Sequence, residues 1–439
     1  MAQTMKAGKE VLAALKARGI GCVIKPAPRE VELSLLPGAK PAEARELLYK
    51  ALNGLEPRFS VFLRGLPACF MPDAWDHALY SKKPGRSYVR FAACGRCSLA
   101  ALCPGLEKGG AFDGPARRLL APVLPAPAEL VLELTKKCNL NCRLCFSSNS
   151  PETLPLAALK RALKEARALG VRSVRFTGGE PFMSPSLLPL LKEARHLGFY
   201  TLVNTNAALD DAALFKKAAP LMDNVLVSLQ APGPAEEKAA TGADFKVKLA
   251  NMRVLRNGVP VFRLGTVASK SFIRGFGRWR ALAVKLEADI WELYRPMPDG
   301  RGAARSGDFD LGPADLKKLS RLAAETEKSG LKTLIANPAP LCLVPQAERK
   351  NLLGAAFDDG HTRLVLDPRG FYKPSYYIEE NLGASLKAAW DSPYRRRLVS
   401  FDWLPARCRG CRWLLKCLGG SRALARAASG TYFAGDPWL

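Results

Sequence analysis

The sequence predicts an α/β protein with a parallel sheet of six strand–helix units, flanked on both sides by cysteine-rich α+β extensions. Between about residues 129 and 295, apolar runs of strand length alternate with amphipathic helical stretches. Such alternation is typical of parallel sheets with right-handed crossovers. Cysteines gather before, inside and after this stretch, and a chain of 439 residues is long enough for two or three domains.

The six units follow one another along the chain. Strands are expected at 130–134, 171–176, 199–203, 224–229, 259–267 and 290–294. The helices between them carry apolar residues at helical spacing and end at glycines such as Gly170, Gly198 and Gly258. Residues 121–128 and 299–313 have the composition of linkers. We therefore expect an N-terminal cysteine-rich domain at 1–120, a domain with the parallel sheet at 128–300 and a C-terminal domain at 310–439.

Three cysteines follow the first strand of this sheet with CxxxCxxC spacing: Cys138, Cys142 and Cys145. Three thiolates can hold three irons of a [4Fe–4S] cluster and leave the fourth iron without a protein ligand. The sequence GGEP begins at Gly178, about thirty residues later, and ends the next strand. Carboxyl ends of parallel strands share one edge, so both motifs are expected together. The alternative is a structural zinc knuckle, which would call for neither GGEP nor the repeated strand–helix pattern.

With these motifs the chain resembles the radical S-adenosylmethionine (radical SAM) superfamily. The resemblance implies an open, partial (β/α)6 barrel and a [4Fe–4S] cluster on Cys138, Cys142 and Cys145. It also implies that S-adenosylmethionine (SAM) binds the open fourth iron and is cleaved to a 5′-deoxyadenosyl radical, which abstracts hydrogen from a substrate. Leu144 stands where the family usually has an aromatic residue near the adenine, and Phe146 is expected to share that role.

The resemblance further assigns contacts to SAM. Its ammonium group needs hydrogen-bond acceptors when buried. The acceptors implied are in the GGEP segment: Gly178, Gly179, Glu180 and Pro181. Polar residues at the third and fourth strand ends would contact the methionine carboxylate or the ribose: Asn204, Thr205 and Ser228. Each of these three is equally consistent with a strand-end cap.

Two cysteine sets with the same layout flank the predicted barrel. Each contains a C-x2-C-x5-C triplet, preceded by a cysteine in a P-x-C-x-x-P frame that follows a predicted helix and strand. The N-terminal set is Cys69, Cys94, Cys97 and Cys103. The C-terminal set is Cys342, Cys408, Cys411 and Cys417. We expect two related units, each with four thiolates for one fully ligated cluster. Zinc is the alternative, because soft thiolate sites accept either metal.

The C-terminal flank also resembles the SPASM/twitch extension of radical SAM enzymes, for example in the run from Cys417 to Gly420. Ser375, Ser421 and Leu439 stand where that extension often has cysteine. The resemblance therefore implies one auxiliary cluster on this flank, and one or two auxiliary [4Fe–4S] clusters in the whole chain. Cys22 is expected to be a plain buried thiol.

The net charge of +26 favours acidic partners. Candidates are a flavodoxin or ferredoxin electron donor, an acidic peptide and a carboxylated small molecule. Lysine and arginine are spread through every region, so we do not expect nucleic acid binding. No apolar run approaches a membrane span, and residues 1–25 form a charged amphipathic segment without a signal-peptide core. We expect a cytoplasmic protein. Only three histidines are present, and no catalytic acid or base is assigned.

These features predict a radical SAM enzyme that oxidatively modifies a substrate, with a peptide as the first choice. One alternative is an enzyme of tetrapyrrole or other cofactor biosynthesis. A second is a non-catalytic iron–sulfur electron carrier or sensor, which would explain the clusters but not the GGEP motif or the open iron. A third is an RNA-modifying radical enzyme, for which co-purifying nucleic acid would be the evidence.

Overall fold

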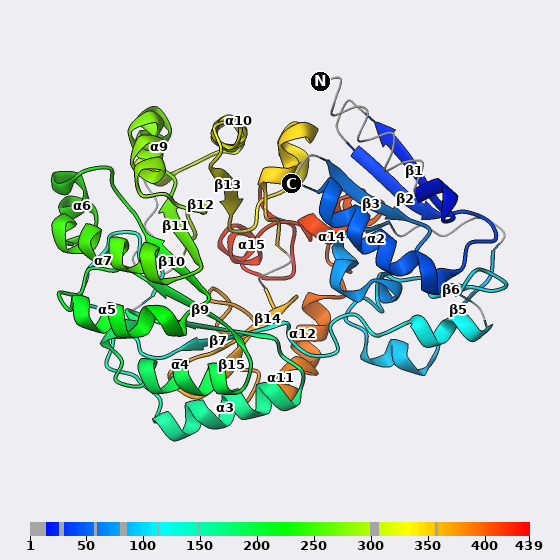
Figure 1. Cartoon of the computed structure of the whole chain (residues 1–439), viewed down its shortest axis with the longest axis horizontal. Coiled ribbons are helices and arrows are strands. Elements are labelled where there is room, and N and C mark those ends of the chain that lie inside the picture. Colours follow the sequence, from blue (N-terminus) through cyan, green and yellow to red (C-terminus); the bar gives the residue numbers. More distant parts are fainter. Residues whose placement is uncertain are drawn as a thin grey trace. The chain divides into compact units, whose positions relative to one another are not determined.

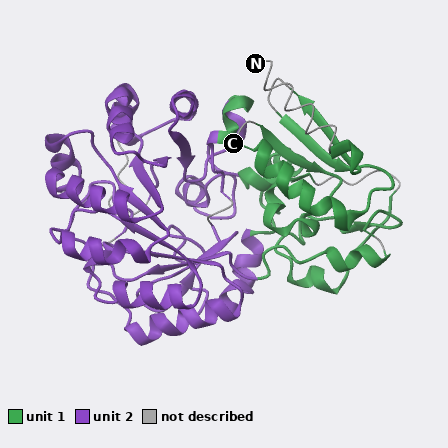
Figure 2. Ribbon diagram, in the orientation of Figure 1, with its two compact units in different colours: residues 1–125, 345–350, 399–418 green, residues 126–344, 351–398, 419–439 purple. Residues whose placement is uncertain are grey.

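The computed structural model describes residues 15–25, 30–56, 59–79, 86–112, 114–147, 149–298, 307–355 and 359–439. The chain forms two compact units (Figure 2). Unit 1 comprises residues 1–125, 345–350 and 399–418, and unit 2 comprises residues 126–344, 351–398 and 419–439. The C-terminal flank, expected as one domain at 310–439, is thus divided between the units.

A nine-stranded sheet forms the frame of unit 2, in the order β13-β12-β11-β10-β9-β8-β7-β14-β15 (Figure 1). The strands β7 to β13 run parallel to their neighbours. They are β7 (Glu129–Glu133), β8 (Ser173–Thr177), β9 (Tyr200–Thr205), β10 (Asn224–Ser228), β11 (Val261–Val267), β12 (Ile290–Tyr294) and β13 (Lys332–Ala336). The predicted parallel α/β fold is confirmed.

The sheet extends beyond the six expected strands at both edges. β13 adds a seventh parallel strand, although the sequence placed it in the C-terminal flank. Beside β7, β14 (Arg363–Leu366) pairs in parallel, and β15 (Tyr372–Lys373) then pairs antiparallel with β14. Short polar-flanked strands of this kind are recognisable only once their long-range partners are known.

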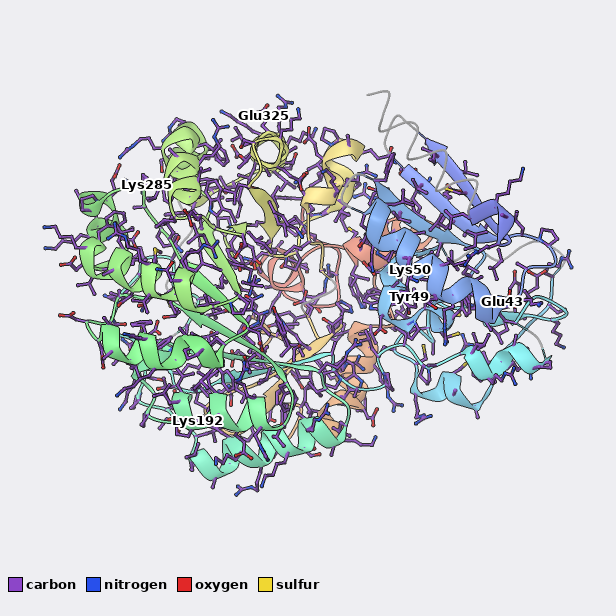
Figure 3. The ribbon with its side chains drawn as sticks, viewed as in Figure 1. Glu43, Tyr49, Lys50, Lys192, Lys285 and Glu325 are labelled. Atoms are coloured by element: carbon purple, nitrogen blue, oxygen red, sulfur yellow. The ribbon has the colours of Figure 1, made fainter. Side chains whose placement is uncertain are left out.

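Helices cover the outer face of this sheet (Figure 1). The helices of this part of unit 2 are α3 (Leu156–Ala168), α4 (Leu187–His196), α5 (Ala212–Ala218), α6 (Pro234–Thr241), α7 (Phe245–Gly258), α8 (Lys270–Arg274), α9 (Phe276–Lys285) and α10 (Pro313–Lys328), of which α6 and α8 also contribute residues to an internal cavity. The short α6 and α8 were not expected from the sequence. The C-terminal part of unit 2 adds α11 (Leu386–Trp390), α12 (Pro393–Leu398) and α15 (Arg422–Ser429). Lys192 on α4 and Lys285 on α9 project outward, in keeping with the basic composition (Figure 3).

Alternation along the strands gives the sheet two different faces. On β8, Val174 and Phe176 are fully buried, whereas Arg175 and Thr177 line an internal cavity. On β12, Trp291 is fully buried while Glu292 faces the same cavity. The outer face is therefore an apolar core, and the inner face is polar.

Unit 1 contains a four-stranded sheet in the order β1-β2-β3-β4. Its strands are β1 (Ile20–Lys25), β2 (Glu30–Leu35), β3 (Ser60–Arg64) and β4 (Ala78–Leu79), and α2 (Pro41–Leu55) packs against β2 and β3. The remaining elements are β5 (Tyr88–Val89), β6 (Leu106–Glu107), α13 (Ala406–Arg409) and α14 (Leu414–Cys417). A charged amphipathic segment was predicted at residues 1–25. Its residues 1–14 lie outside the described part of the chain, and its last six residues form β1.

The C-terminal cysteine loop packs within unit 1. The Trp413 ring meets the edge of Phe62 on β3, with ring centroids 4.9 Å apart. The guanidinium of Arg412 pairs with Glu30 at 3.1 Å and with Glu32 at 2.9 Å on β2. These contacts explain why residues 399–418 fold with the N-terminal sheet. Among the described residues, no helix is long and apolar enough to cross a membrane.

Candidate active site

A cavity of about 1160 Å³ opens on the inner face of the unit 2 sheet. It is lined by all three cysteines of the CxxxCxxC loop: Cys138, Cys142 and Cys145. Most other residues predicted for this site also line it: Phe146, Gly178, Gly179, Asn204, Thr205 and Ser228. Glu180 and Pro181 are the two that do not; both are buried beside it.

The paired glycines let the cysteine loop lie against the end of β8. A Cβ atom on Gly178 would come within 2.2 Å of the Thr135 carbonyl oxygen, and one on Gly179 within 2.1 Å of the Lys137 carbonyl oxygen. The φ of Gly178 is +142°, which disfavours any side chain. The N–H groups of Gly179 and Glu180 donate to Thr135 and Lys137 at 2.7 and 2.8 Å. The motif thus anchors the backbone immediately before Cys138.

The Glu180 carboxylate is fully buried and is not among the groups that line the cavity. It accepts hydrogen bonds from the Thr205 hydroxyl at 2.7 Å, the Asn206 N–H at 2.8 Å and the Phe182 N–H at 3.1 Å. Burial raises its pKa to about 7, although these donors act in the opposite direction. Its side chain joins the ends of β8 and β9, which is a positioning role.

Asn206 belongs to the site although the sequence analysis did not select it. Its Nδ2 atom lies 2.9 Å from Asn139 Oδ1 and 3.6 Å from Cys138 Sγ. It also lines the cavity. The signal was present in the sequence, because Asn206 shares its strand end with Asn204 and Thr205.

A buried ion pair lies beside the cysteine loop. Lys248 Nζ on α7 is 2.5 Å from Glu237 Oε1 on α6, and both side chains are almost completely buried. Glu237 also accepts from the Gln230 N–H at 3.1 Å. Burial raises the pKa of Cys142 to about 11, and the neighbouring thiols add to this while Lys248 opposes it. Helical spacing from Phe245 and Met252 places Lys248 on the apolar face of α7, but no local pattern indicated Glu237 as its partner.

Charged side chains cover the inner face of the sheet. Arg175 binds Glu129 through two hydrogen bonds of 3.1 and 3.0 Å and donates to Asn204 at 3.0 Å. Arg263 pairs with Glu292 at 2.5 Å and donates to Asn224 at 2.7 Å. We call Arg175, Arg263, Arg363, Glu129 and Glu292 the charged layer.

Two buried polar atoms near this layer have no hydrogen-bond partner among the described residues: Arg263 Nη2 and the hydroxyl oxygen of Tyr376. Both residues line the cavity. Buried donors are nearly always satisfied, so these two atoms suit a bound acceptor. The charged layer has three guanidinium groups and two carboxylates, and this excess of positive charge favours an anionic acceptor.

An aromatic wall closes part of the cavity. Phe146 packs against the rings of Tyr376 and Tyr377, with centroids 5.6 and 5.3 Å away. Ala423 and Leu424 of α15 join Tyr377 in the same apolar cluster. The ring of Phe146, expected beside adenine, is therefore held in place by residues of the C-terminal flank.

The flanking cysteines fall into different parts of the chain. Four thiols line one small cavity in unit 1: Cys69, Cys94, Cys97 and Cys103. The triplet Cys408, Cys411 and Cys417 also belongs to unit 1, whereas Cys342 is exposed and belongs to unit 2. All twelve cysteines are free of disulfides. Among the described residues, no three His, Cys, Asp or Glu side chains are arranged as ligands around a single metal ion.

Residues 132–269 match the family model of the radical SAM superfamily. The matched stretch contains the CxxxCxxC loop, the GGEP segment and the ends of β9 and β10. The neighbouring residues that line the cavity, including Lys248 and Arg263, also fall within it.

Solved structures of similar fold include Streptococcus suis SuiB bound to precursor peptide SuiA, with a TM-score of 0.59 and 18% identity over 71% of this chain and 75% of that chain. SuiB bound to S-adenosylmethionine has a TM-score of 0.58 and 19% identity over 71% and 76%. Native anSMEcpe with bound AdoMet has a TM-score of 0.55 and 16% identity over 71% and 94%. At these identities the likeness is one of fold.

Proposed function

This chain belongs to the radical SAM superfamily, and we propose that it reductively cleaves SAM to a 5′-deoxyadenosyl radical and oxidatively modifies a peptide. The observation that carries the proposal is the cavity on the inner face of the unit 2 sheet. It joins the three thiols of the CxxxCxxC loop to a substrate-sized space. Its volume, about 1160 Å³, exceeds that of an ordinary small-molecule pocket, which suits SAM together with part of a second molecule.

The residues present fit a [4Fe–4S] cluster with SAM. Cys138, Cys142 and Cys145 would hold three irons, and the soft thiolate donors are those that iron–sulfur clusters use. When bound, such a cluster supplies the electron that splits the sulfonium of SAM and yields the 5′-deoxyadenosyl radical. Gly178 and Gly179 line the cavity beside the cysteine loop without side chains, which leaves room there for the ammonium group of SAM.

Other residues hold and tune this arrangement. Asn206 brings its amide N–H to the sulfur of Cys138, and such hydrogen bonds adjust cluster potentials. The Lys248 cation favours the thiolate form of Cys142. Asn204, Thr205 and Ser228 present polar groups along the same cavity, where they would bind the carboxylate or ribose of SAM.

Several observations support a peptide as substrate. SuiB is known in complex with the precursor peptide SuiA, and anSMEcpe in complex with the Cp18Cys peptide. The net charge of +26 would attract an acidic peptide, and likewise an acidic electron donor such as flavodoxin or ferredoxin. An oxidative outcome needs an electron acceptor, for which the flanking cysteine sets are the candidates.

The charged layer favours a second candidate, a carboxylate-rich small molecule such as a tetrapyrrole precursor. Arg263→Met would remove the guanidinium whose Nη2 is free for a ligand. Arg278→Met is the matched control, since Arg278 also lines the cavity but is exposed and paired with Glu236. Selective loss of response to carboxylated metabolites in Arg263→Met would favour this candidate over the peptide.

The test is SAM cleavage by protein purified and reconstituted without oxygen. With dithionite and SAM, we expect 5′-deoxyadenosine, and we expect its formation to rise with peptide-sized cell fractions. The Cys138→Ala/Cys142→Ala/Cys145→Ala variant should form none. Absence of 5′-deoxyadenosine from the iron-loaded wild-type chain would instead identify an electron carrier or sensor. Stimulation by metabolite-sized fractions alone would replace the peptide with a small molecule.

A further inference from the structure

The four N-terminal cysteines form a compact thiol site in unit 1. Cys69 lies on the 3-10 helix Ala68–Phe70, and Cys94 on the 3-10 helix Ala92–Arg96. With Cys97 and Cys103 they line a cavity of about 30 Å³, whose wall includes Phe91 and Val123. Segments distant in sequence thus bring four sulfurs to one enclosed, partly apolar space.

Backbone N–H groups contact two of the four sulfurs. The Gly105 N–H donates to Cys103 Sγ at 3.4 Å. The backbone N–H groups of Leu99 and Val123 also hydrogen-bond the Cys97 thiol. N–H···S hydrogen bonds stabilise metal-bound thiolates and tune iron–sulfur potentials. Backbone donors are therefore in place at two of the four sulfurs that would bind a metal.

The loop is also tied down from outside. The Arg90 guanidinium donates to the carbonyls of Ala100 at 2.8 Å and Cys103 at 3.1 Å. The Ala121 N–H donates to the Cys69 carbonyl at 2.9 Å, and the Ser98 N–H to the Val123 carbonyl at 3.0 Å. The segment that leads toward β7 is therefore hydrogen-bonded to both cysteine-bearing parts of the site.

The second C-x2-C-x5-C loop repeats this backbone. The Cys97 N–H donates to the Cys94 carbonyl at 3.1 Å, and the Cys411 N–H to the Cys408 carbonyl at 3.1 Å. The third cysteine of each loop donates to the carbonyl four residues earlier, at 2.9 Å for Cys103 and 2.8 Å for Cys417. The two loops are far apart in the sequence, yet their backbones form the same hydrogen bonds. This shared pattern indicates a common role.

We infer that Cys69, Cys94, Cys97 and Cys103 bind a [4Fe–4S] cluster of their own in which every iron has a protein ligand. With no open iron, this cluster carries electrons and binds neither SAM nor substrate. Four thiolates are also a ligand set of the type that zinc takes. The choice of iron rests on the proposed function, since a radical SAM chain is already supplied with iron and sulfide for its barrel loop.

The test counts metals in variants of the full chain purified and reconstituted without oxygen. Cys97→Ala is expected to lose about four irons and four sulfides per chain relative to wild type. Cys22→Ala, which removes a half-buried thiol on β1 outside the site, is the matched control and should lose none. Loss of zinc instead of iron, or unchanged metal content, would overturn the proposal.

A second variant covers the case in which Cys97→Ala fails to fold. Replacing Cys138, Cys142, Cys145, Cys408, Cys411 and Cys417 together by alanine leaves the N-terminal set intact. This variant should keep about four irons per chain, with the Mössbauer spectrum of a [4Fe–4S] cluster and no 5′-deoxyadenosine formation. Retention of zinc alone, or of no metal, would refute the N-terminal cluster. Failure of SAM cleavage in wild type would refute the proposed function and leave this count unaffected.

Discussion

The Cys138 loop of unit 2 and the Cys94 loop of unit 1 both gather thiols around a cavity, but their surroundings differ. The first has three cysteines and opens into about 1160 Å³ lined by charged and polar side chains. The second has four cysteines around about 30 Å³. Three sulfurs with room beside them suit a cluster that binds a ligand, and four sulfurs without room suit one that only passes electrons.

The polar groups near the sulfurs also differ between the two loops. Backbone N–H groups serve the sulfurs of unit 1, as at Gly105 and Cys103. In unit 2, side chains take part: Asn206 reaches Cys138, and Lys248 acts on Cys142. Side chains from several strands and helices position a reactive site more specifically than one loop can, because each arises from a separate rigid element.

The largest expected difference between the two loops is in how replacing one cysteine changes 5′-deoxyadenosine formation. Cys142→Ala should abolish 5′-deoxyadenosine formation, because the barrel loop would retain only two thiol ligands. Cys97→Ala should still cleave SAM in the absence of substrate, because it leaves the unit 2 cavity intact. Quantifying 5′-deoxyadenosine in both variants checks this. Equal loss in the two would mean that the loops do not have separate roles.

Lys248→Met should lower the free energy of unfolding, because side chains such as Lys248 hold the unit 2 site together. It leaves the buried Glu237 carboxylate without its cation, and breaking a buried pair typically costs about 3–5 kcal/mol. The double variant Lys248→Met/Glu237→Gln should recover much of this loss, since it buries no unpaired charge. Denaturant unfolding of the three proteins measures the effect. A double variant as unstable as the single one would show that the pair is not the cause.

Gly179→Ala probes the close approach between GGEP and the cysteine loop. A methyl group 2.1 Å from the Lys137 carbonyl must displace backbone, and overpacking of this kind costs about 1–3 kcal/mol. We also expect the Cys138 loop of Gly179→Ala to bind less iron. Gly277→Ala on α9 is the control, because nothing lies within 4 Å of its added Cβ and alanine favours helices. Equal free energies of unfolding for Gly179→Ala and Gly277→Ala would show that the methyl group added at Gly179 does not clash.

The parallel sheet and most of the site were predictable because their signals are local. Alternating apolar runs gave the strands, and strand ends placed Cys138, Gly178 and Asn204 at one edge. The two glycines also follow from sequence, since GGEP after a strand demands close backbone approach. The structure supplies the physical reason, which is contact with the carbonyls of Thr135 and Lys137.

The rest depends on partners far apart in the chain. Arg175 looks like an ordinary polar strand residue until Glu129 is found beside it on β7. Lys248 is a charged residue at an apolar-face position of α7, and only Glu237 on α6 explains its burial. The Cys408 triplet joins unit 1 through Arg412 and its carboxylate partners on β2, which no local pattern reveals.

The last prediction concerns the pH dependence of stability that the Glu180 carboxyl group causes. Its folded-state pKa of about 7 exceeds the ordinary 4.5, so the folded chain binds this proton more tightly than the unfolded chain does. The resulting stability is complete below pH 4.5 and is lost as the pH rises through 7, by about 1.4 kcal/mol per pH unit within that window. Glu180→Gln, neutral throughout, lacks this slope.

Chemical unfolding of the cluster-free chain between pH 5 and 8 measures the difference. As the pH rises, the free energy of unfolding of wild type should fall relative to that of Glu180→Gln. Glu325→Gln, on the exposed side of α10, is the control and should run parallel to wild type (Figure 3). Parallel curves for Glu180→Gln would mean that the donors on Thr205, Asn206 and Phe182 keep the carboxylate ionised. Glu180 would then hold the strand ends together as a permanent anion, a role that needs no proton at any pH in this range.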